Sequence, residues 1–290
     1  MPKSILDDVD DIIDRAFGLK RIGEKRIGRA PHYRHRESYL KLSREPVNDL
    51  DAKALLNDIY EKVKSNWGHD REPSKENWRF EKQTGISRKN KSPEVKLERA
   101  IVNIPEEIWP DANNWVNQVS TASGLMNGSS DKHRDIDLVH QCENDSYEFI
   151  ELKVKVESGA PLYAAMEILQ YGVLYIFARG NKQIRDAVKD ERLLKAKVIH
   201  LKVLAPCDYY KGCKLDWLEK EINGGLKKFL AERMPDLQMD FKFDSFLQND
   251  VIAQAFRDCR RPVYPWGHGH VVPLPSCVTF TIFLACLSGL

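Results

Sequence analysis

The chain has 290 residues, of which 42% are hydrophobic and 30% are charged, and its formal net charge is +2. Such a length and composition indicate a folded protein of one large or two modest domains, and they exclude collagen-like, low-complexity and disulfide-scaffold proteins. A net charge this close to zero gives no overall field that would by itself point to nucleic acid or a membrane as the partner.

The cysteines and the two ends of the chain bear on its compartment. Six cysteines occur at irregular spacing without a CxxC pair, which favours free thiols in a reducing compartment. The acidic N-terminus lacks the basic start and apolar run of a signal peptide. Residues 277–290 are strongly apolar but too few for a membrane-spanning helix, which needs roughly 20 residues. We therefore expect a cytoplasmic protein with no membrane contact, in which this tail is a buried strand or packing segment; membrane anchoring is the less favoured alternative.

The first third of the chain is predicted to be helical and basic. Ser4 is suited to cap a helix whose apolar residues, up to Phe17, lie on one face. Residues 20–45 hold nine Lys/Arg against three acids, with histidines and tyrosines between them. Such a segment either follows a phosphate backbone or forms an ordinary solvated surface. A second helix is expected over residues 51–65.

A domain boundary is expected after the polar stretch 66–92, which reads as a long loop or linker. It separates a helical region, residues 1–91, from a main domain, residues 92–290. Within the main domain we expect a core at about 92–206 and a C-terminal extension at 207–290.

The two regions differ in charge. Residues 1–92 carry 21 Lys/Arg and 16 Asp/Glu, a net charge of +5, whereas residues 93–290 have a net charge of −3. The small net charge of the whole chain is therefore the sum of a basic and a slightly acidic region. This difference in charge would suit a basic arm that holds DNA, attached to a more acidic domain.

The main domain is predicted to be a mixed α/β structure. Ser92 followed by Pro93 is a helix start, and this helix should run to about Asn103. The remaining elements follow from hydrophobic periodicity and turn residues: strands at 115–123, 134–141 and 147–156, helices at 161–179 and 183–195, a strand at 197–205, a helix at 215–234 interrupted by Gly224 and Gly225, and a strand at 237–246. The helix between the third and fourth strands would be a crossover connection.

The segment 134–155 has the clearest chemical pattern. If it forms a hairpin with a three-residue turn centred on Asn144, Asp137 lies opposite Glu151, with Cβ atoms about 4.5–5.5 Å apart. Because side chains alternate along a strand, one face then collects four charged residues: Asp135, Asp137, Glu151 and Lys153. The other face becomes the core side, with Ile136, Leu138, Ile150, Leu152 and Val154.

Asp137 and Glu151 would repel each other in this arrangement unless a cation or a proton lies between them. A hard divalent metal ion with oxygen ligands removes the conflict. An ammonium group beside the ion, here that of Lys153, can help to orient a metal-bound water and to promote its deprotonation, or can neutralise charge on a phosphate, while the metal itself lowers the pKa of the water. The pattern therefore indicates phosphodiester hydrolysis. The alternative is a solvated face of mutually paired charges, which is common on hairpins.

The order of these elements resembles the PD-(D/E)xK nuclease superfamily, the restriction-endonuclease-like fold. The resemblance covers roughly residues 92–206, and its motif stands here as Asp137 followed by Glu151-Leu152-Lys153. It implies an α/β fold with an αβββαβ core, a mixed sheet flanked by helices. Ile136 precedes Asp137 where the family often has proline, and Asp135 competes with Asp137 as the first acid.

The resemblance implies specific roles for these residues. Asp137, Glu151 and Lys153 would be catalytic together with Glu98 on the preceding helix, where Glu94 is a less favoured choice. The metal ion would be Mg²⁺, for which Mn²⁺ can substitute, held at Asp137, Glu151, Glu98 and Leu152.

Five further residues are candidates for substrate binding. Arg88 and Lys89 precede the Glu98 helix, and Lys132 and Arg134 lead into the hairpin, so their charges could contact phosphate. Gln170 could contact a phosphate or the attacking water, although it is equally an ordinary polar helix position. The family's Gln-x-x-x-Tyr spacing is absent, because Tyr171 follows Gln170 directly.

We expect from this a metal-dependent nuclease acting on DNA, with an endonuclease favoured and RNA as another substrate. Restriction, phage defence, repair and mobile-element functions are all compatible, and a homodimer would suit cleavage of both strands. A non-catalytic nucleic-acid-binding or scaffolding module of the same fold is the alternative, and a plain protein-interaction domain is a further one. A zinc site in the tail, from Cys259, His268, His270 and Cys277, is disfavoured because the spacing matches no common arrangement.

Overall fold

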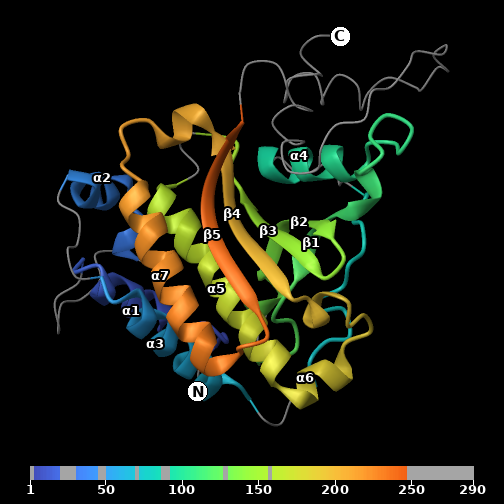
Figure 1. Ribbon diagram of the computed structural model, residues 1–290, viewed down its shortest axis with the longest axis horizontal. Coiled ribbons are helices and arrows are strands. Elements are labelled where there is room, and N and C mark those ends of the chain that lie inside the picture. The colour runs from blue at the N-terminus through green and yellow to red at the C-terminus, as the bar shows by residue number, and fades with distance from the viewer. Residues whose placement is uncertain are drawn as a thin grey trace.

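A five-stranded sheet forms the centre of the protein (Figure 1). The computed structural model describes residues 3–19, 31–44, 50–68, 72–85, 92–126, 130–155 and 159–246. The strands are β1 (Trp115–Ser120), β2 (Asp135–Glu143), β3 (Ser146–Leu152), β4 (Val198–Pro206) and β5 (Gln238–Phe246), in that order across the sheet. β1, β2 and β3 are antiparallel neighbours, whereas β3, β4 and β5 run parallel. The expected α/β class with a mixed sheet is confirmed.

Helices cover both faces of the sheet. On one face lie α5 (Pro161–Gly180) and α7 (Asp216–Arg233), with α1 (Val9–Ala16) and α3 (Ala52–Asn66) behind them (Figure 1). On the opposite face α4 (Pro93–Val102) packs beside β1 and β2. The shorter helices are α2 (Arg36–Arg44) and α6 (Lys182–Ala187), with 3₁₀ turns η1 (His32–Arg34), η2 (Ala112–Asn114), η3 (Ser130–His133), η4 (Leu193–Lys195) and η5 (Cys207–Tyr210).

The chain enters the sheet in the order expected from the sequence. Helix α4 is followed by three strands, the crossover helix α5 and the strand β4, and the pair α7 and β5 extends the parallel side. A connection between parallel neighbours needs a dozen or more residues, and a helix supplies them both times. The edges of this sheet are β1 and β5.

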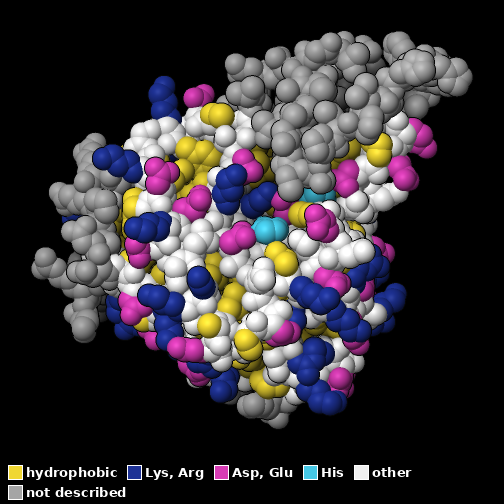
Figure 2. Space-filling view, viewed as in Figure 1, with side chains coloured by type: hydrophobic (Ala, Val, Ile, Leu, Met, Phe, Trp, Pro, Cys, Tyr) yellow, Lys and Arg dark blue, Asp and Glu magenta, His cyan; other side chains and the backbone are white. Residues whose placement is uncertain are grey.

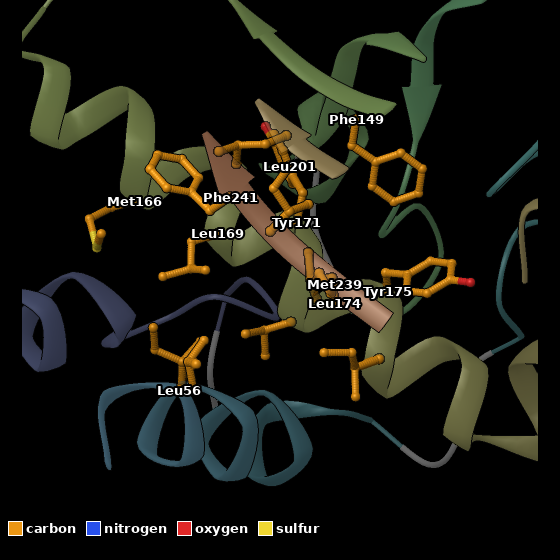
Figure 3. Close-up of a cluster of buried hydrophobic side chains, with 14 of the residues drawn as sticks. Leu56, Phe149, Met166, Leu169, Tyr171, Leu174, Tyr175, Leu201, Met239 and Phe241 are labelled. Carbon is orange, nitrogen blue, oxygen red and sulfur yellow. The ribbon is translucent and has the colours of Figure 1, made fainter. Parts of the chain in front are cut away.

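Helix α5 is the central element of the larger core. Its side chains meet those of α3, β4 and β5 in one continuous apolar cluster, part of which is drawn in Figure 3 with Leu56, Leu174, Leu201 and Phe241 labelled. By length and composition α5 could cross a membrane, but 89% of its most apolar stretch is buried within the molecule. Its hydrophobicity is therefore accounted for by packing on all sides.

The β2–β3 hairpin has the register that the sequence predicts. Leu138 pairs with Ile150 and Val139 with Phe149, which puts Asp137 opposite Glu151 one step further on. The turn itself differs from the prediction. It is a two-residue turn at Asn144 and Asp145, and a β-bulge between Gln141 and Glu143, just before the turn, supplies the one-residue offset that a three-residue turn would have given.

The charged face of the hairpin is also a packed face, which the sequence analysis missed. Val139 and Phe149 lie on the same side as Asp137 and Glu151 and are fully buried under α5. The opposite face was predicted correctly to be apolar, and there Leu138 and Leu152 pack against α4 in a second, smaller core. The strands of a sheet that is covered on both faces have nearly continuous hydrophobic sequences. It is therefore hard to tell from the sequence which of their side chains point to which face.

Three other expectations are corrected. Helix α1 begins at Val9, because Ser4 donates a hydrogen bond to Asp131 (Oγ to Oδ1, 2.5 Å) instead of capping a helix. The helix expected at 183–195 ends at Ala187, and the Asp190 carboxylate accepts a hydrogen bond from the Arg192 N–H at 2.9 Å, a local bond that competes with helix formation. The short helix α2 lies where only a basic segment was expected.

The stretch expected to be a linker packs into the core. Where the structure describes it, residues 72–85, it has neither helix nor strand, yet Trp78 is fully buried between Phe149 and Tyr175. A single tryptophan buries as much surface as several small apolar side chains, so one residue anchors an otherwise polar segment. The boundary near residue 91 stays a prediction, but the helices before it share the α5 core.

Several predictions fall on residues outside those described. They concern Arg88 and Lys89, most of the basic segment before Pro31, the apolar tail and the disfavoured zinc residues Cys259, His268, His270 and Cys277.

Candidate functional site

The carboxylates of Asp137 and Glu151 meet where β2 begins and β3 ends. The Leu152 backbone N–H donates a hydrogen bond to Asp137 (N to Oδ2, 2.8 Å), which holds this carboxylate against the backbone between Glu151 and Lys153. Glu151 is buried, whereas Asp137 keeps part of its surface in contact with solvent. Three of the predicted catalytic residues therefore lie together.

Lys153 is enclosed by carboxylates. Its Nζ donates a hydrogen bond to Glu151 and lies 3.3 Å from Oε2 of Glu167 on α5. Burial opposes the charge of the ammonium, but the surrounding carboxylates, Glu151 first, outweigh it and raise the pKa of Lys153 well above its ordinary value. Lys153 is therefore a permanent cation and hydrogen-bond donor in this site.

Glu98 reaches the same cluster from α4. Its side chain has no exposed surface, and Oε2 accepts a hydrogen bond from Gln118 (Nε2 to Oε2, 2.6 Å). Oε1 is buried and has no hydrogen-bond partner among the described residues. Burial first, and then the charge of Asp137, raise the pKa of Glu98 to about 8. An orphaned buried carboxylate oxygen indicates a missing donor or cation.

Gln118 is a residue of this site that the sequence analysis did not find. It lies in β1 between residues paired with Leu138 and Ile136, which places it opposite Asp137, and it adopts a left-handed conformation with φ of 51°. Such a conformation is unfavourable for a residue other than glycine, and it is retained where the surrounding structure holds it. β1 is continuous, but Gln118 has no pair in the ladder with β2, and its side-chain amide reaches Glu98.

The acidic groups destabilise one another's charges. Burial raises the pKa of Asp137 to about 7, although Lys153 and the Leu152 N–H act in the opposite direction. Burial, followed by the charges of Asp137 and Glu167, raises the pKa of Glu151 well above its ordinary value. One lysine does not balance this concentration of carboxylates, so the site has an excess of negative charge that a proton or a metal cation would neutralise.

Glu167 and Tyr163 on α5 complete the wall around Lys153, and the sequence analysis missed both. The Tyr163 hydroxyl donates a hydrogen bond to Glu167 (Oη to Oε1, 3.4 Å). A signal was present in the sequence, because Glu167 is the only charged residue among the first 18 of this helix. A lone acid in a buried helix is costly unless it has a partner, which makes it a candidate for function.

The donor types of the acidic cluster suit a hard divalent cation, although its carboxylates are not among the described residues whose ligand atoms all lie within 4.8 Å of one another. Glu98, Asp137 and Glu151 offer carboxylate oxygens, the ligands that Mg²⁺ and Mn²⁺ prefer, and the free Oε1 of Glu98 points to a missing partner. Leu152 could contribute only through its backbone, because its side chain is apolar and fully buried.

The two acids that were considered as alternatives to Asp137 and Glu98 have other hydrogen-bond partners. Asp135 accepts a hydrogen bond from Ser120 (Oγ to Oδ1, 2.6 Å) on the neighbouring strand. Glu94 accepts one from Ser92 at the start of α4, and its charge acts on both Glu98 and Asp137. Glu98 is thus the acid of α4 that reaches into the cluster.

The predicted substrate-binding residues divide into two groups. Arg134 and Gln170 line a small pocket that adjoins Glu167. Lys132 is exposed on the turn before β2, and no contact places it in that pocket. Arg88 and Lys89 lie outside the described residues, so their predicted role in substrate binding stays a prediction.

A second group of potential metal ligands lies on the other face of the sheet. His140, Cys142 and Glu148 offer ligand atoms within 4.8 Å of one another. Nδ1 of His140 is 3.0 Å from Glu148, and Nε2 is 2.8 Å from Asp111. Lys202 also pairs with Glu148. This nitrogen, sulfur and oxygen set would suit zinc rather than Mg²⁺.

Ion pairs already satisfy this second group. Burial lowers the pKa of His140, but hydrogen bonds, that to Asp111 first, outweigh burial and raise it to about 11. The same histidine, followed by Lys202, lowers the pKa of Glu148 to about 2 in spite of burial. The network therefore balances its own charges, unlike the cluster around Lys153.

Comparison of the chain with protein-family models, with curated proteins and with solved structures finds no match.

Proposed function

We propose that the protein is a metal-dependent nuclease of the restriction-endonuclease-like fold, with DNA as its substrate. The observation that carries the proposal is the cluster of Asp137, Glu151 and Lys153 at adjoining strand ends, with the buried carboxylate of Glu98 beside it. The helix and strand order from α4 to β4 is the αβββαβ order of that fold.

In this proposal Asp137, Glu151 and Glu98 hold Mg²⁺, for which Mn²⁺ can substitute, with the backbone at Leu152 as a further ligand. The ion, when bound, polarises the phosphate and makes water a better nucleophile. The network of Gln118 and the Leu152 N–H keeps the carboxylates oriented before substrate arrives.

Lys153 acts as a cation rather than as a base. The carboxylates around it, Glu151 first, raise its pKa in spite of burial and thereby favour the protonated amine, which is a hydrogen-bond donor. It can donate hydrogen bonds to a phosphate oxygen and neutralise the charge that develops there during hydrolysis. Glu151 and Glu167 hold the amine in place for this.

Cleavage of supercoiled plasmid and of linear DNA, in Mg²⁺ and in EDTA, tests the proposal. We expect cleavage only with metal, and a fall of at least about 100-fold in Glu151→Gln and in Lys153→Ala, the size of loss seen when one electrostatic catalytic group is removed. Lys182→Ala is the matched control, because its side chain is 81% exposed in a surface ion pair.

Undiminished cleavage by both folded variants would contradict the assignment. Circular dichroism should accompany the assay, because removing Lys153 leaves buried carboxylates unpaired and destabilises the fold. Products from supercoiled plasmid would support the expected endonuclease, and a parallel assay on RNA examines the other substrate. DNA binding by the wild type without metal-dependent cleavage would favour the non-catalytic module instead.

A further inference from the structure

A small polar pocket lies next to the acidic cluster. It has a volume of about 160 Å³ and is walled by the N-terminal segment on one side and by α5 on the other. Pockets for whole drug-sized ligands have volumes of roughly 300–1,000 Å³. The pocket is thus too small for a nucleoside, but it has room for a compact charged group and a few water molecules.

Two arginines from distant parts of the chain line this pocket. Arg34 comes from η1 in the N-terminal region, and Arg134 directly precedes β2, three residues before Asp137. Nε of Arg134 is buried and has no hydrogen-bond partner among the described residues. Buried guanidinium nitrogens ordinarily have an acceptor, so this atom indicates one that the protein itself does not provide.

Arg34 is positioned by aromatic packing. Its guanidinium carbon lies 4.5 Å from the ring centroid of Tyr163, and the Tyr33 ring stacks on the same residue with centroids 5.7 Å apart. Nζ of Lys153 lies 5.9 Å from that Tyr163 centroid. One tyrosine ring therefore contacts both the pocket arginine and the lysine of the acidic cluster.

The acids that line the pocket already have partners. Glu167 pairs with Lys153 and accepts a hydrogen bond from Tyr163. Asp10 accepts a hydrogen bond from the Tyr33 hydroxyl at 2.7 Å. The two arginines consequently remain the groups best placed to meet an anion, and Gln170, on the same wall, adds an amide.

We propose that this pocket binds a phosphate group of the nucleic-acid strand, next to the bond that is cut. The inference rests on the proposed nuclease function and extends it, because it makes Arg34, and with it the N-terminal region, part of the substrate site. Guanidinium groups form paired hydrogen bonds with phosphate oxygens, and two of them match its charge. The phosphate can be the terminal group of a strand or an internal diester.

The test measures binding apart from cleavage. Fluorescence anisotropy in EDTA measures how tightly the protein binds three single-stranded DNAs: a linear oligonucleotide with a 5′-phosphate, the same oligonucleotide with a 5′-hydroxyl, and a closed circle. The measurement compares the wild type with the pocket variants Arg34→Gln and Arg134→Gln, and the variant Arg192→Gln is the control. Arg192 contacts the ring of Phe80 and is not among the residues that line the pocket.

We expect each pocket variant to bind at least about tenfold more weakly than the wild type, as befits the loss of a charge-assisted hydrogen bond, and the control to bind normally. A loss confined to the 5′-phosphorylated strand identifies a terminal phosphate, and an equal loss on all three DNAs identifies an internal one. Inorganic phosphate should compete with DNA for the wild type and much less for either variant.

Wild-type affinity in both pocket variants for all three DNAs would overturn the inference, whether or not the protein cuts DNA. Conversely, a protein that never cleaves but shows these affinity losses would keep the phosphate pocket and lose only the nuclease proposal. Arg134→Lys, which retains the charge, replaces Arg134→Gln if that variant does not fold, and it should bind between the wild type and Arg34→Gln.

Discussion

Three carboxylates surround Lys153 at the junction of α4, β2, β3 and α5, namely Asp137, Glu151 and Glu167, and the carboxylate of Glu98 lies beside Asp137. In water these groups would all be ionised at neutral pH. Here burial, followed by the repulsion between neighbouring charges, raises the pKa of Glu98, Asp137 and Glu151, so the folded chain without metal binds protons that the unfolded chain releases. We therefore expect the stability of the fold to depend on pH and, if the site binds a metal ion as proposed, on that ion as well.

Glu98→Gln should stabilise the metal-free protein increasingly as the pH rises. The pKa of Glu98 is raised from 4.5 to about 8 in the folded chain. Below pH 4.5 the Glu98 carboxyl is neutral in both the folded and the unfolded chain, so pH does not affect the free energy of unfolding through this group. Between pH 4.5 and about 8 the carboxyl ionises in the unfolded chain but not in the folded one. The free energy of unfolding of the wild type therefore falls by at most about 1.4 kcal/mol per pH unit in this range. Glutamine does not titrate, so the variant keeps its stability.

Chemical denaturation in EDTA at pH 5, 6.5 and 8 measures this difference. Glu107→Gln, an exposed acid after α4, is the control and should follow the wild type at each pH. Added Mg²⁺ should recover more stability in the wild type than in Glu98→Gln at pH 8. A difference that stays constant or shrinks with rising pH would show that Glu98 is ionised in the folded protein.

Helix α7 shows how a close approach between elements can override helix propensity. Gly224 and Gly225 were expected to interrupt this helix, but α7 is continuous from Asp216 to Arg233. A Cβ atom on Gly225 would lie 2.6 Å from Cβ of Ala52 in α3, whereas one on Gly224 would have no atom within 4 Å. Gly225 is thus required by packing, and Gly224 is not.

The two neighbouring glycines should respond oppositely to the same substitution. Gly224→Ala should stabilise the protein by about 0.5–1 kcal/mol, because alanine is the better helix former and the site is open. Gly225→Ala should destabilise it by about 1–3 kcal/mol, because α3 must move away from α7. Urea denaturation of both variants measures the two effects, and a shared sign would contradict the packing of α3 on α7.

At the scale of the whole molecule, the N-terminal helices and the sheet form one structure. Asn66 at the end of α3 donates hydrogen bonds to the carbonyls of Ile5 and Asp7, and Arg233 of α7 pairs with Glu61 of α3. The apolar residues of α1 and α3 belong to the same cluster as those of α5 and α7. This region is therefore more than the attached arm that its charge suggested.

Deletion of residues 1–67 should abolish cooperative folding rather than only weaken DNA binding. It would expose the apolar side of α5, which α3 covers. The full chain should unfold in a single transition seen alike by far-ultraviolet circular dichroism and tryptophan fluorescence. A truncated protein that melts cooperatively at the same temperature, or two separate transitions in the full chain, would show that the regions fold independently.

The distribution of charge also depends on the fold. On the face shown in Figure 2, Lys and Arg side chains are intermixed with Asp and Glu, so neither sign forms a continuous patch there. The charge difference along the sequence therefore does not translate directly into a basic surface on this face. The binding groups that we propose are two arginines in a pocket rather than a broad basic surface.

The sequence by itself determined the order of the elements and the hairpin register. Strand alternation and a short turn leave few ways to pair residues 134–155, and this is why Asp137 and Glu151 could be placed opposite each other. The helix start at Ser92 and Pro93 and the strand ended by Pro206 likewise depend on local rules. Local signals sufficed wherever the relevant partners lie close in the chain.

Only the tertiary structure decided what surrounds that pair. Glu167 reaches Lys153 because α5 lies on that face of the sheet, and Gln118 reaches Glu98 through an irregular strand. Arg34 joins Arg134 across 100 residues of chain because the N-terminal helices pack on α5. Such contacts depend on how faces pack rather than on spacing along the sequence, and many sequence separations are compatible with the same contact. For that reason the motif could be read from the sequence, but the site around it could not.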